Sequence, residues 1–472
     1  MKPIVIFLLS FLATMPLIAE ISLPEILGDH MVLQQNSVVK FWGTSSTKTT
    51  VSVRVSWTNT VFSCTPKPDG SWELSVFTPK GSFNKHNIII SDGVPITLKN
   101  ILIGEVWFCS GQSNMAMTFT GYKKEPVANA NEELIQANEE SGIRMFNVEK
   151  YASYELIVPA KGDWLVSSSQ NLANFSAVAY YYAVNLQKEL QVPIGIINSS
   201  YGGSTIEGWL NQGNIQKYDD YPMNPDIPDS ESYLRPNVMF QGMVRPFRNY
   251  TIKGIIWYQG ESNVGRPTSY TQKLIDLVYL LRFTFDSNEL PFYVVEIAPY
   301  RYEGITDPAK LREAQFKATQ SLYYAGIIST NDLVPEAEAN CIHPSNKKSV
   351  GERLANLALL ETYQFDTIPA HSPHFTGMEI KGNSVVLSFD HTYDGLHIEG
   401  DEITGFEVGN EQHEFHPVQA KLGKEANTIE IQIGYRTPNP AVRYCFKNYQ
   451  VGNVKNSAGL PLIPFRTDNW AE

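Results

Sequence analysis

The stretch ILIGEVWFCSGQSNM, residues 101 to 115, decides the fold of this chain, because a strand pattern stops there and a turn begins. The run 101–108 is largely apolar and predicts a buried strand. Small and amide residues then surround one serine, Ser113. A turn needs glycine and asparagine, but it does not need a serine between two amides. Ser113 is therefore a candidate nucleophile at the end of a strand.

Strand-like and helix-like runs alternate on the C-terminal side of this stretch, up to about residue 366. Strands of this length separated by helices predict a parallel sheet with helices on both faces. In such folds, side chains that do chemistry collect at the carboxyl ends of the strands. The predicted strands span 101–108, 193–200, 252–260, 291–300 and 325–330, and the predicted helices span 175–190, 269–285, 309–322 and 348–363.

Both flanks of this α/β region have a different, β-rich pattern. Residues 20–100 contain short alternating or apolar runs and no amphipathic helix, which predicts a β-sandwich-like domain. A proline-rich linker, TIPAHSPHF at 367–375, precedes a second β-domain over 372–472. The expected domains are thus 20–100, 101–366 and 372–472. Two long insertions, 121–165 and 214–236, are interpreted as walls of a binding cleft.

Composition excludes several partners. The net charge of −12 argues against nucleic acid and against anionic membrane surfaces. Residues 1–19 combine Lys2 with an apolar run and Ala19, which predicts a signal peptide and a secreted or periplasmic protein. A membrane anchor is the alternative, and Pro16 and the short length disfavour it. No other stretch reaches about 18 apolar residues, so we expect no membrane insertion after signal removal.

Three clusters of small residues follow three of the predicted strands: GQSNM, SSYGGSTIEGW and YQGESN. If the sheet is parallel, all three clusters meet at one edge. Acyl transfer needs hydrogen-bond donors for the oxyanion, and the backbone N–H groups of Ser113 and Gly203 are suited to this. A side-chain amide, Gln259 or Asn263, is the candidate third donor.

The base follows by elimination. The chain has nine histidines, and His343 alone lies between residues 101 and 366. It belongs to NCIHPSNK, a loop before the last predicted helix, where Pro344 restricts the backbone. A solvated surface histidine is the alternative, and the three clusters argue against it.

Four blocks now resemble a known family: GEVWFCSGQSNM, SSYGGSTIEGW, GIIWYQGESN and IHPSNK are similar to those of the sialate O-acetylesterase branch of the SGNH hydrolases. The resemblance implies a flavodoxin-like, three-layer α/β/α parallel sheet flanked by the two β-domains. It implies Ser113 as nucleophile and His343 as base. It also implies an oxyanion hole of Ser113 N–H, Gly203 N–H and an amide, with Gln259 favoured over Asn263.

One position departs from the family pattern. SGNH enzymes commonly carry an aspartate three residues before the histidine, and here that residue is Asn340. An amide cannot stabilise an imidazolium as a carboxylate does. We expect a Ser–His dyad, in which a backbone carbonyl or Asn340 orients His343. The alternative is an acid from elsewhere, with these candidates: Asp332, Glu336, Glu338 and Glu261.

Further residues have a structural and a functional interpretation. Arg266 is a candidate partner for a sugar carboxylate, whereas Arg312 is interpreted as structural. Glu261 is alternatively a support for the loop around Gln259. Cys109 and Cys341 lie near Ser113 and His343 in sequence and are interpreted as buried thiols or as a disulfide between the two loops. The four cysteines form no CxxC pair, so a metal site has no support.

The favoured function is removal of O-acetyl groups from sialic acid through an acetyl-enzyme, without metal or cofactor. An acetylxylan esterase, or an esterase of another acetylated glycan, is the nearest alternative. A glycan-binding protein on an inactive esterase scaffold belongs to a different class and is motivated by Asn340. A lipid esterase is disfavoured because the chain has no long apolar lid segment.

Overall fold

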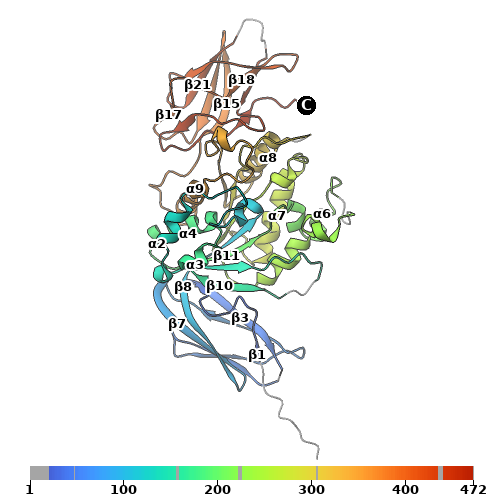
Figure 1. The fold of residues 1–472 in the computed structure, drawn as a ribbon, viewed down its shortest axis with the longest axis vertical. Coiled ribbons are helices and arrows are strands. Elements are labelled where there is room, and N and C mark those ends of the chain that lie inside the picture. The colour runs from blue at the N-terminus through green and yellow to red at the C-terminus, as the bar shows by residue number, and fades with distance from the viewer. Residues whose placement is uncertain are drawn as a thin grey trace, which may run out of the picture.

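The computed structural model describes residues 21–46, 48–155, 159–221, 226–304, 307–433 and 439–470. The predicted signal peptide, residues 1–19, lies outside them. Three regions follow one another along the long axis of the molecule, as Figure 1 shows: an N-terminal group of strands, a central sheet with helices, and a C-terminal group of strands.

The central sheet is parallel except at one edge. Its strand order is β10–β9–β11–β8–β12–β13–β14, and only β10 pairs antiparallel along this path. Its strands are nearly all buried, as expected for a parallel sheet covered on both faces. Their bounds are β8 (Pro95–Gly111), β9 (Ile143–Val148), β10 (Gly162–Val166), β11 (Ile194–Ser200), β12 (Gly254–Tyr258), β13 (Phe292–Val295) and β14 (Ala325–Ile328).

Helices cover both faces of this sheet, so the predicted three-layer α/β/α arrangement is confirmed. The helices α4 (Ala177–Leu190) and α9 (Lys347–Glu361) pack together in one apolar core with Trp107 of β8. The next residue, Phe108, faces the opposite core with α7 (Tyr270–Thr284) and α8 (Pro308–Gln320). The start of α4 is fixed by Ser176, whose side chain accepts a hydrogen bond from the Ala179 N–H.

Shorter helical segments lie in the connections. They are α1 (Ser113–Ala116), α2 (Ala130–Gln136), α3 (Ser169–Leu172), α5 (Ile206–Trp209), α6 (Gln212–Ile215), the 3-10 turns η1 (Glu139–Ser141), η2 (Asp229–Leu234), η4 (Arg245–Phe247), η5 (Glu261–Asn263) and η6 (Glu336–Glu338), and the π-helical turn η3 (Phe240–Val244).

The N-terminal strands are joined to the central sheet through β8, which is 17 residues long. Its first half pairs antiparallel with β7, and its second half pairs parallel with β11 and β12. The predicted domain boundary at residue 100 therefore falls inside one continuous strand. The other N-terminal strands are β1 (Ile21–Ser22), β2 (Val32–Gln34), β3 (Val38–Ser45), β4 (Val51–Val55), β5 (Val61–Cys64), β6 (Ser71–Phe77) and β7 (Ser82–Ser91).

The C-terminal region consists of antiparallel sheets around a separate apolar core. Arg312 of α8 is buried, and its guanidinium donates to the carbonyls of Cys445 and Lys447, so this arginine has the structural role expected for it. The strands are β15 (His374–Lys381), β16 (Ser384–Asp390), β17 (Leu396–Ile398), β18 (Phe406–Gly409), β19 (Phe415–Pro417), β20 (Ala420–Leu422), β21 (Thr428–Gln432), β22 (Ala441–Tyr444), β23 (Val454–Asn456) and β24 (Phe465–Arg466).

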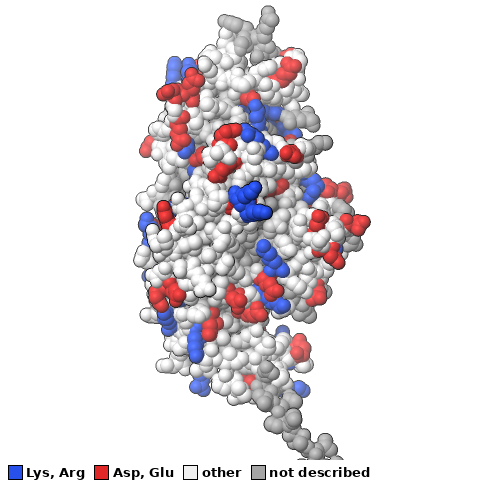
Figure 2. Space-filling model, viewed as in Figure 1, with Lys and Arg blue, Asp and Glu red and all other residues white. Residues whose placement is uncertain are grey.

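Surface charge follows the composition. On the face shown in Figure 2, Lys and Arg are scattered among Asp and Glu without an extended basic area. Among the described residues, no helix combines the length and the apolar character needed to cross a bilayer.

Gly111 at the end of β8 allows the nucleophile turn to pass close to β12. Its φ is +137°, and a Cβ added there would lie 2.1 Å from the carbonyl oxygen of Tyr258. We expect Gly111→Ala to lower the free energy of unfolding by about 3 kcal/mol, since both the backbone conformation and the contact become unfavourable. Urea unfolding measures this. Gly265→Ala is the matched control because an added Cβ there meets nothing within 4 Å. Equal stability of the two variants would contradict the prediction.

Candidate active site

The structure brings Ser113 and His343 together at the carboxyl edge of the parallel sheet. The Oγ of Ser113 lies 2.8 Å from Nε2 of His343, although the two residues are 230 positions apart in the chain. The other ring nitrogen of His343, Nδ1, lies 2.6 Å from Oε2 of Glu125. A hydroxyl, an imidazole and a carboxylate in this order form the arrangement of a serine hydrolase triad.

The strand-to-helix turn after β8 presents the serine. β8 ends at Gly111, and α1 begins at Ser113, so the hydroxyl lies where the chain leaves the sheet. Tyr122 holds this turn from the other side, because its hydroxyl donates to the Ser113 carbonyl at 3.0 Å. The Tyr122 ring also packs against the His343 ring, with 4.7 Å between the ring centroids. One tyrosine therefore contacts both the nucleophile turn and the base.

The loop that carries His343 is held by its own hydrogen bonds. The Cys341 thiol donates to the His343 carbonyl at 3.1 Å. Glu338 accepts from both the backbone N–H and the hydroxyl of Ser345, at 2.9 and 2.5 Å. Asn346 then caps α9 by accepting from the Ser349 N–H. These contacts fix the imidazole between the serine and the carboxylate.

The electrostatic surroundings keep His343 neutral near pH 7. Burial lowers the pKa of His343, and the Glu125 carboxylate opposes this shift without reversing it. A neutral imidazole with Nδ1–H bonded to Glu125 leaves the lone pair of Nε2 directed at Ser113. The pair can therefore remove a proton from the hydroxyl at neutral pH.

The expected Ser–His dyad is wrong, because Glu125 supplies a carboxylate. The candidate acids proposed from the sequence have other partners. Asp332 forms a two-pronged ion pair with Arg353 at 2.7 Å, Glu336 pairs with Arg301, and Glu338 binds Ser345.

Asn340 and Glu261, the two other candidates for orienting His343, do not do so in the structure. Asn340 is exposed, and none of the described hydrogen bonds joins it to His343. Glu261 is buried and accepts from the amide of Asn114 at 2.6 Å. The alternative interpretation of Glu261, as a support for its loop, agrees with this contact.

Glu125 was missed because it belongs to the segment that we interpreted as an insertion, twelve residues after Ser113. It closes a tight turn, in which Tyr122 and Glu125 exchange backbone hydrogen bonds of 2.9 and 3.0 Å. The segment returns to the histidine loop, since the Ala128 N–H donates to the Ser345 carbonyl at 3.0 Å. A single sequence carries no local signal for this approach.

The turn Gly202–Gly203 lies beside Ser113. A Cβ added at Gly202 would be 3.4 Å from the Cβ of Ser113. Gly203 has a φ of +77°, a Cβ added to it would lie 2.8 Å from the Tyr233 ring, and its carbonyl accepts from the Ser262 hydroxyl at 2.9 Å. The backbone N–H groups of Ser113 and Gly203 thus belong to adjacent turns at one edge, where oxyanion donors are required.

Neither predicted side-chain donor is free. The Gln259 amide nitrogen donates to the Ser204 carbonyl at 3.1 Å and to Asn263 Oδ1 at 2.8 Å, and the side chain is fully buried. The Asn263 amide nitrogen donates to the carboxylate of Glu207 at 3.0 and 3.2 Å. The expectation that Gln259 or Asn263 faces the oxyanion is therefore corrected, because both amides form a buried network under the site.

Comparisons with known proteins agree with this geometry. The sequence profile of the family described as carbohydrate esterase, sialic acid-specific acetylesterase, matches residues 103–360, which include the serine, the histidine and the carboxylate. The chain belongs to this family. As a carbohydrate esterase, it is a carboxylic ester hydrolase.

Relatives and a solved structure extend the similarity beyond the central sheet. Human sialate O-acetylesterase is 29% identical over 70% of this chain and 68% of its own length. The rat enzyme of the same name is 25% identical over 93% of both chains. The crystal structure of a carbohydrate acetylesterase from Xanthomonas citri superposes with a TM-score of 0.86 and 27% identity, covering 96% of this chain and all of that one.

Arg266 of this carbohydrate esterase lies beside a buried carboxylate. Its guanidinium lies 3.5 Å from the buried carboxylate of Glu207 and 4.8 Å from the centroid of the Tyr221 ring. Lys273 binds the same carboxylate at 2.8 Å. Burial alone would raise the pKa of Glu207, but the charges of Lys273 and Arg266 and the hydrogen bonds from Lys273 and Asn263 together lower it. Arg266 therefore faces a carboxylate of the protein itself, and its binding of a sugar carboxylate stays a prediction.

The cysteine alternatives are also decided. All four cysteines are free thiols, so the hypothesis of a disulfide between the two catalytic loops is wrong. Cys109 is fully buried in β8, and burial raises its thiol pKa well above the usual value. Cys341 is partly buried and bonded within the histidine loop.

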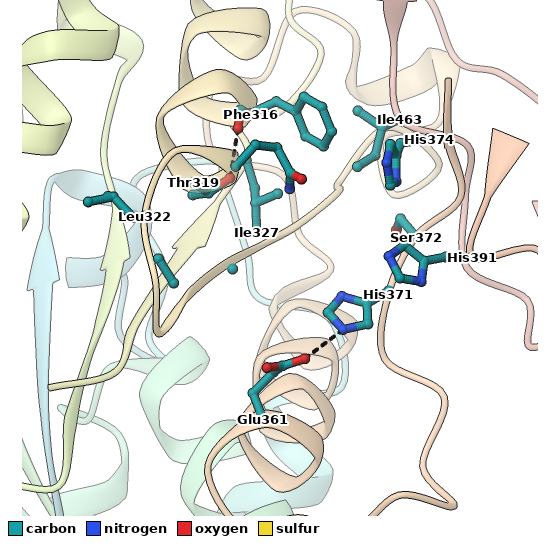
Figure 3. Close-up of a pocket in the computed structure, with 13 residues that line it drawn as sticks. Phe316, Thr319, Leu322, Ile327, Glu361, His371, Ser372, His374, His391 and Ile463 are labelled. Atoms are coloured by element: carbon teal, nitrogen blue, oxygen red, sulfur yellow. Dashed lines mark hydrogen bonds and ion pairs between the residues drawn. The ribbon is translucent and has the colours of Figure 1, made fainter. Parts of the chain in front are cut away.

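A separate pocket of about 220 Å³ lies where the central region meets the C-terminal strands, and Figure 3 shows its lining. His371 Nε2 lies 2.8 Å from the Glu361 carboxylate, and the His371 ring stacks on His391, with 4.5 Å between ring centroids, while the ring centroids of His374 and His391 are 5.3 Å apart. Stacked rings do not direct their nitrogens at one point. Within the described ranges, no group of three or more His, Cys, Asp or Glu side chains is arranged to hold a metal ion.

Proposed function

We propose that this carbohydrate esterase removes O-acetyl groups from sialic acid or sialoglycans through a covalent acetyl-enzyme on Ser113. The observation that carries the proposal is the continuous chain of hydrogen bonds from Ser113 through His343 to Glu125. Binding of a glycan does not require a hydroxyl, an imidazole and a carboxylate that are hydrogen-bonded in series, whereas ester hydrolysis does. The predicted signal peptide supports export, to the periplasm or outside the cell, as the place of action.

The proposed reaction has two halves. His343 Nε2 takes the hydroxyl proton while Ser113 Oγ attacks the acetyl carbonyl carbon, and the oxyanion is held by the N–H groups of Ser113 and Gly203. The tetrahedral intermediate expels the sugar oxygen, which receives the proton from His343. Water then attacks the acetyl-enzyme with His343 as base again, and acetate leaves. Glu125 stabilises the imidazolium in both halves.

Recognition of an acidic sugar would require a cation near Ser113 whose charge is available. The ammonium of Lys150 lies 5.6 Å from the centroid of the Tyr201 ring, and the Lys150 side chain is exposed. Tyr201 directly precedes the Gly202 turn beside Ser113 and stacks on Tyr233, with 5.6 Å between centroids. Lys150 therefore supports binding of a carboxylate at the rim of the site, with the tyrosine pair against the sugar.

We expect acetate release to be faster from O-acetylated sialic acid than from acetylated xylan fragments. We further expect Lys150→Met to raise KM for the acetylated sialic acid by about tenfold, since one charge-assisted contact is lost. The same variant should keep its KM for a neutral chromogenic acetyl ester. Acetate is measured over the panel for both proteins, together with a long-chain acyl ester.

Lys253→Met is the matched control, because Lys253 also lies over a tyrosine ring, 5.5 Å from Tyr363, but at the start of β12, the opposite end of the sheet. It should leave every KM unchanged. Faster release from acetylated xylan would contradict sialic acid as the substrate and would favour an acetylxylan esterase. Preference for the long acyl chain would favour a lipid esterase.

A further inference from the structure

Three buried polar side chains form a chain behind the catalytic residues: Glu261, Asn114 and Lys347. The Asn114 amide nitrogen donates to Glu261 Oε1 at 2.6 Å, and the Asn114 amide oxygen accepts from the Lys347 ammonium at 2.6 Å. Their exposed fractions are 6%, 0% and 1%. They come from three separate segments, namely the loop after β12, the α1 turn and the start of α9.

The amide of Asn114 joins the two catalytic loops. Besides Glu261, its nitrogen donates to the carbonyl of Ile342 at 3.0 Å. Asn114 follows Ser113, and Ile342 precedes His343, so this one amide links the neighbours of nucleophile and base. The chain between those loops is long, and their separation is therefore set by contacts across the fold.

Charges at both ends orient this amide. The amide oxygen accepts from the Lys347 ammonium, and the amide nitrogen donates to the Glu261 carboxylate. Both hydrogen bonds are therefore charge-assisted. The two charges do not touch each other directly. The other Glu261 oxygen, Oε2, is buried and has no hydrogen-bond partner among the described residues. Burying two charges is costly, so the arrangement is not explained by a gain in stability.

We propose that Lys347 is a positioning residue for ester hydrolysis: its ammonium fixes the Asn114 amide that joins the Ser113 turn to the His343 loop. This inference rests on the proposed serine chemistry. Loss of the Lys347 proton removes the cationic donor and leaves Glu261 without its counter-charge. The neutral amine can still donate to the Asn114 oxygen, but the contact is no longer charge-assisted, so the amide is held less firmly and the Ser113–His343 distance is fixed less tightly.

The proton on Lys347 is released close to the working pH range. Burial lowers the pKa of Lys347 to about 8, and the carboxylates of Glu261, Glu338 and Glu125 oppose this shift. Activity should therefore fall as pH rises through about 8. The charge of Lys347 also acts on His343, whose pKa it lowers.

The test is the pH profile of Lys347→Met. We expect kcat at pH 7 to fall by about 10- to 100-fold with KM within about twofold of the native value, as for a misplaced catalytic pair. The decrease in activity of the native protein above about pH 8 should be absent in this variant. The acid limb should move to higher pH, because the cation that lowered the His343 pKa is gone. A role in folding alone would change neither limb.

Two further variants keep the test decisive. Glu261→Gln preserves shape but removes the charge that raises the Lys347 pKa, so the alkaline limb should shift to lower pH. Lys348→Met removes the neighbouring exposed lysine of α9 and should leave both limbs in place. Unchanged limbs in Lys347→Met and Glu261→Gln, alongside an inactive Ser113→Ala, would overturn the positioning role while leaving the esterase chemistry intact.

Discussion

Replacing Ser113 by alanine is expected to lower kcat for a chromogenic acetyl ester by about 10⁵- to 10⁶-fold, since no other group can form the acetyl-enzyme. His343 and Glu125 would remain paired but without a nucleophile to activate. Residual turnover would reflect the oxyanion donors and binding alone. The measurement is initial rate at saturating ester, corrected for spontaneous hydrolysis, with thermal unfolding to show that the variant is folded.

Ser110→Ala is the matched control for this experiment. Ser110 lies on β8, three residues before Ser113, it is buried, and its Oγ has no partner among the described residues. Its loss should leave kcat unchanged. Turnover by Ser113→Ala at the native rate would remove the serine mechanism, and absence of turnover by the native protein would favour a glycan-binding protein on an inactive scaffold.

The second large effect is expected for Glu125→Gln, which keeps the side-chain size but removes the charge next to His343. The imidazolium loses its stabilisation and the ring loses its fixed tautomer, so kcat should fall by about 10²- to 10⁴-fold. The Glu125 carboxylate raises the pKa of His343, and its removal should move the acid limb of kcat/KM to lower pH. The pH profile is measured between pH 4 and 8.

Glu336→Gln serves as the control, because Glu336 is an exposed glutamate that precedes the same loop and pairs with Arg301 rather than with His343. It should retain native kcat and the native acid limb. If Glu125→Gln behaves like this control, the carboxylate has no catalytic role, and the dyad expected from the sequence would be restored.

The sequence predicts the central fold well because the relevant signals are local. Apolar strands such as 101–108 and 193–200 alternate with long helices. This pattern predicts a parallel sheet that is covered by helices on both faces. The antiparallel edge strand β10 and the length of β8 could not be read in the same way. Pairing partners and strand continuity are set by contacts between distant segments.

The sequence predicts those residues of the site that lie at or near the ends of the predicted strands. Ser113 and His343 follow from the position of small residues and from the lone histidine of the central region. Glu125 could not be found, because its segment has no periodic pattern and its approach to His343 depends on the turn at Tyr122. The amides of Gln259 and Asn263 were placed at the right edge, but sequence does not tell which way a buried amide points.

The 17-residue strand β8 has a consequence for how the molecule behaves as a whole. The first half of this strand is hydrogen-bonded to the N-terminal β-region, and its last residue stands two positions before the nucleophile. The N-terminal region is therefore not expected to fold separately from the central sheet. Without it, the first half of β8 would lose the strands with which it pairs. Melting of that region and misalignment of the reactive hydroxyl should therefore occur in one cooperative event.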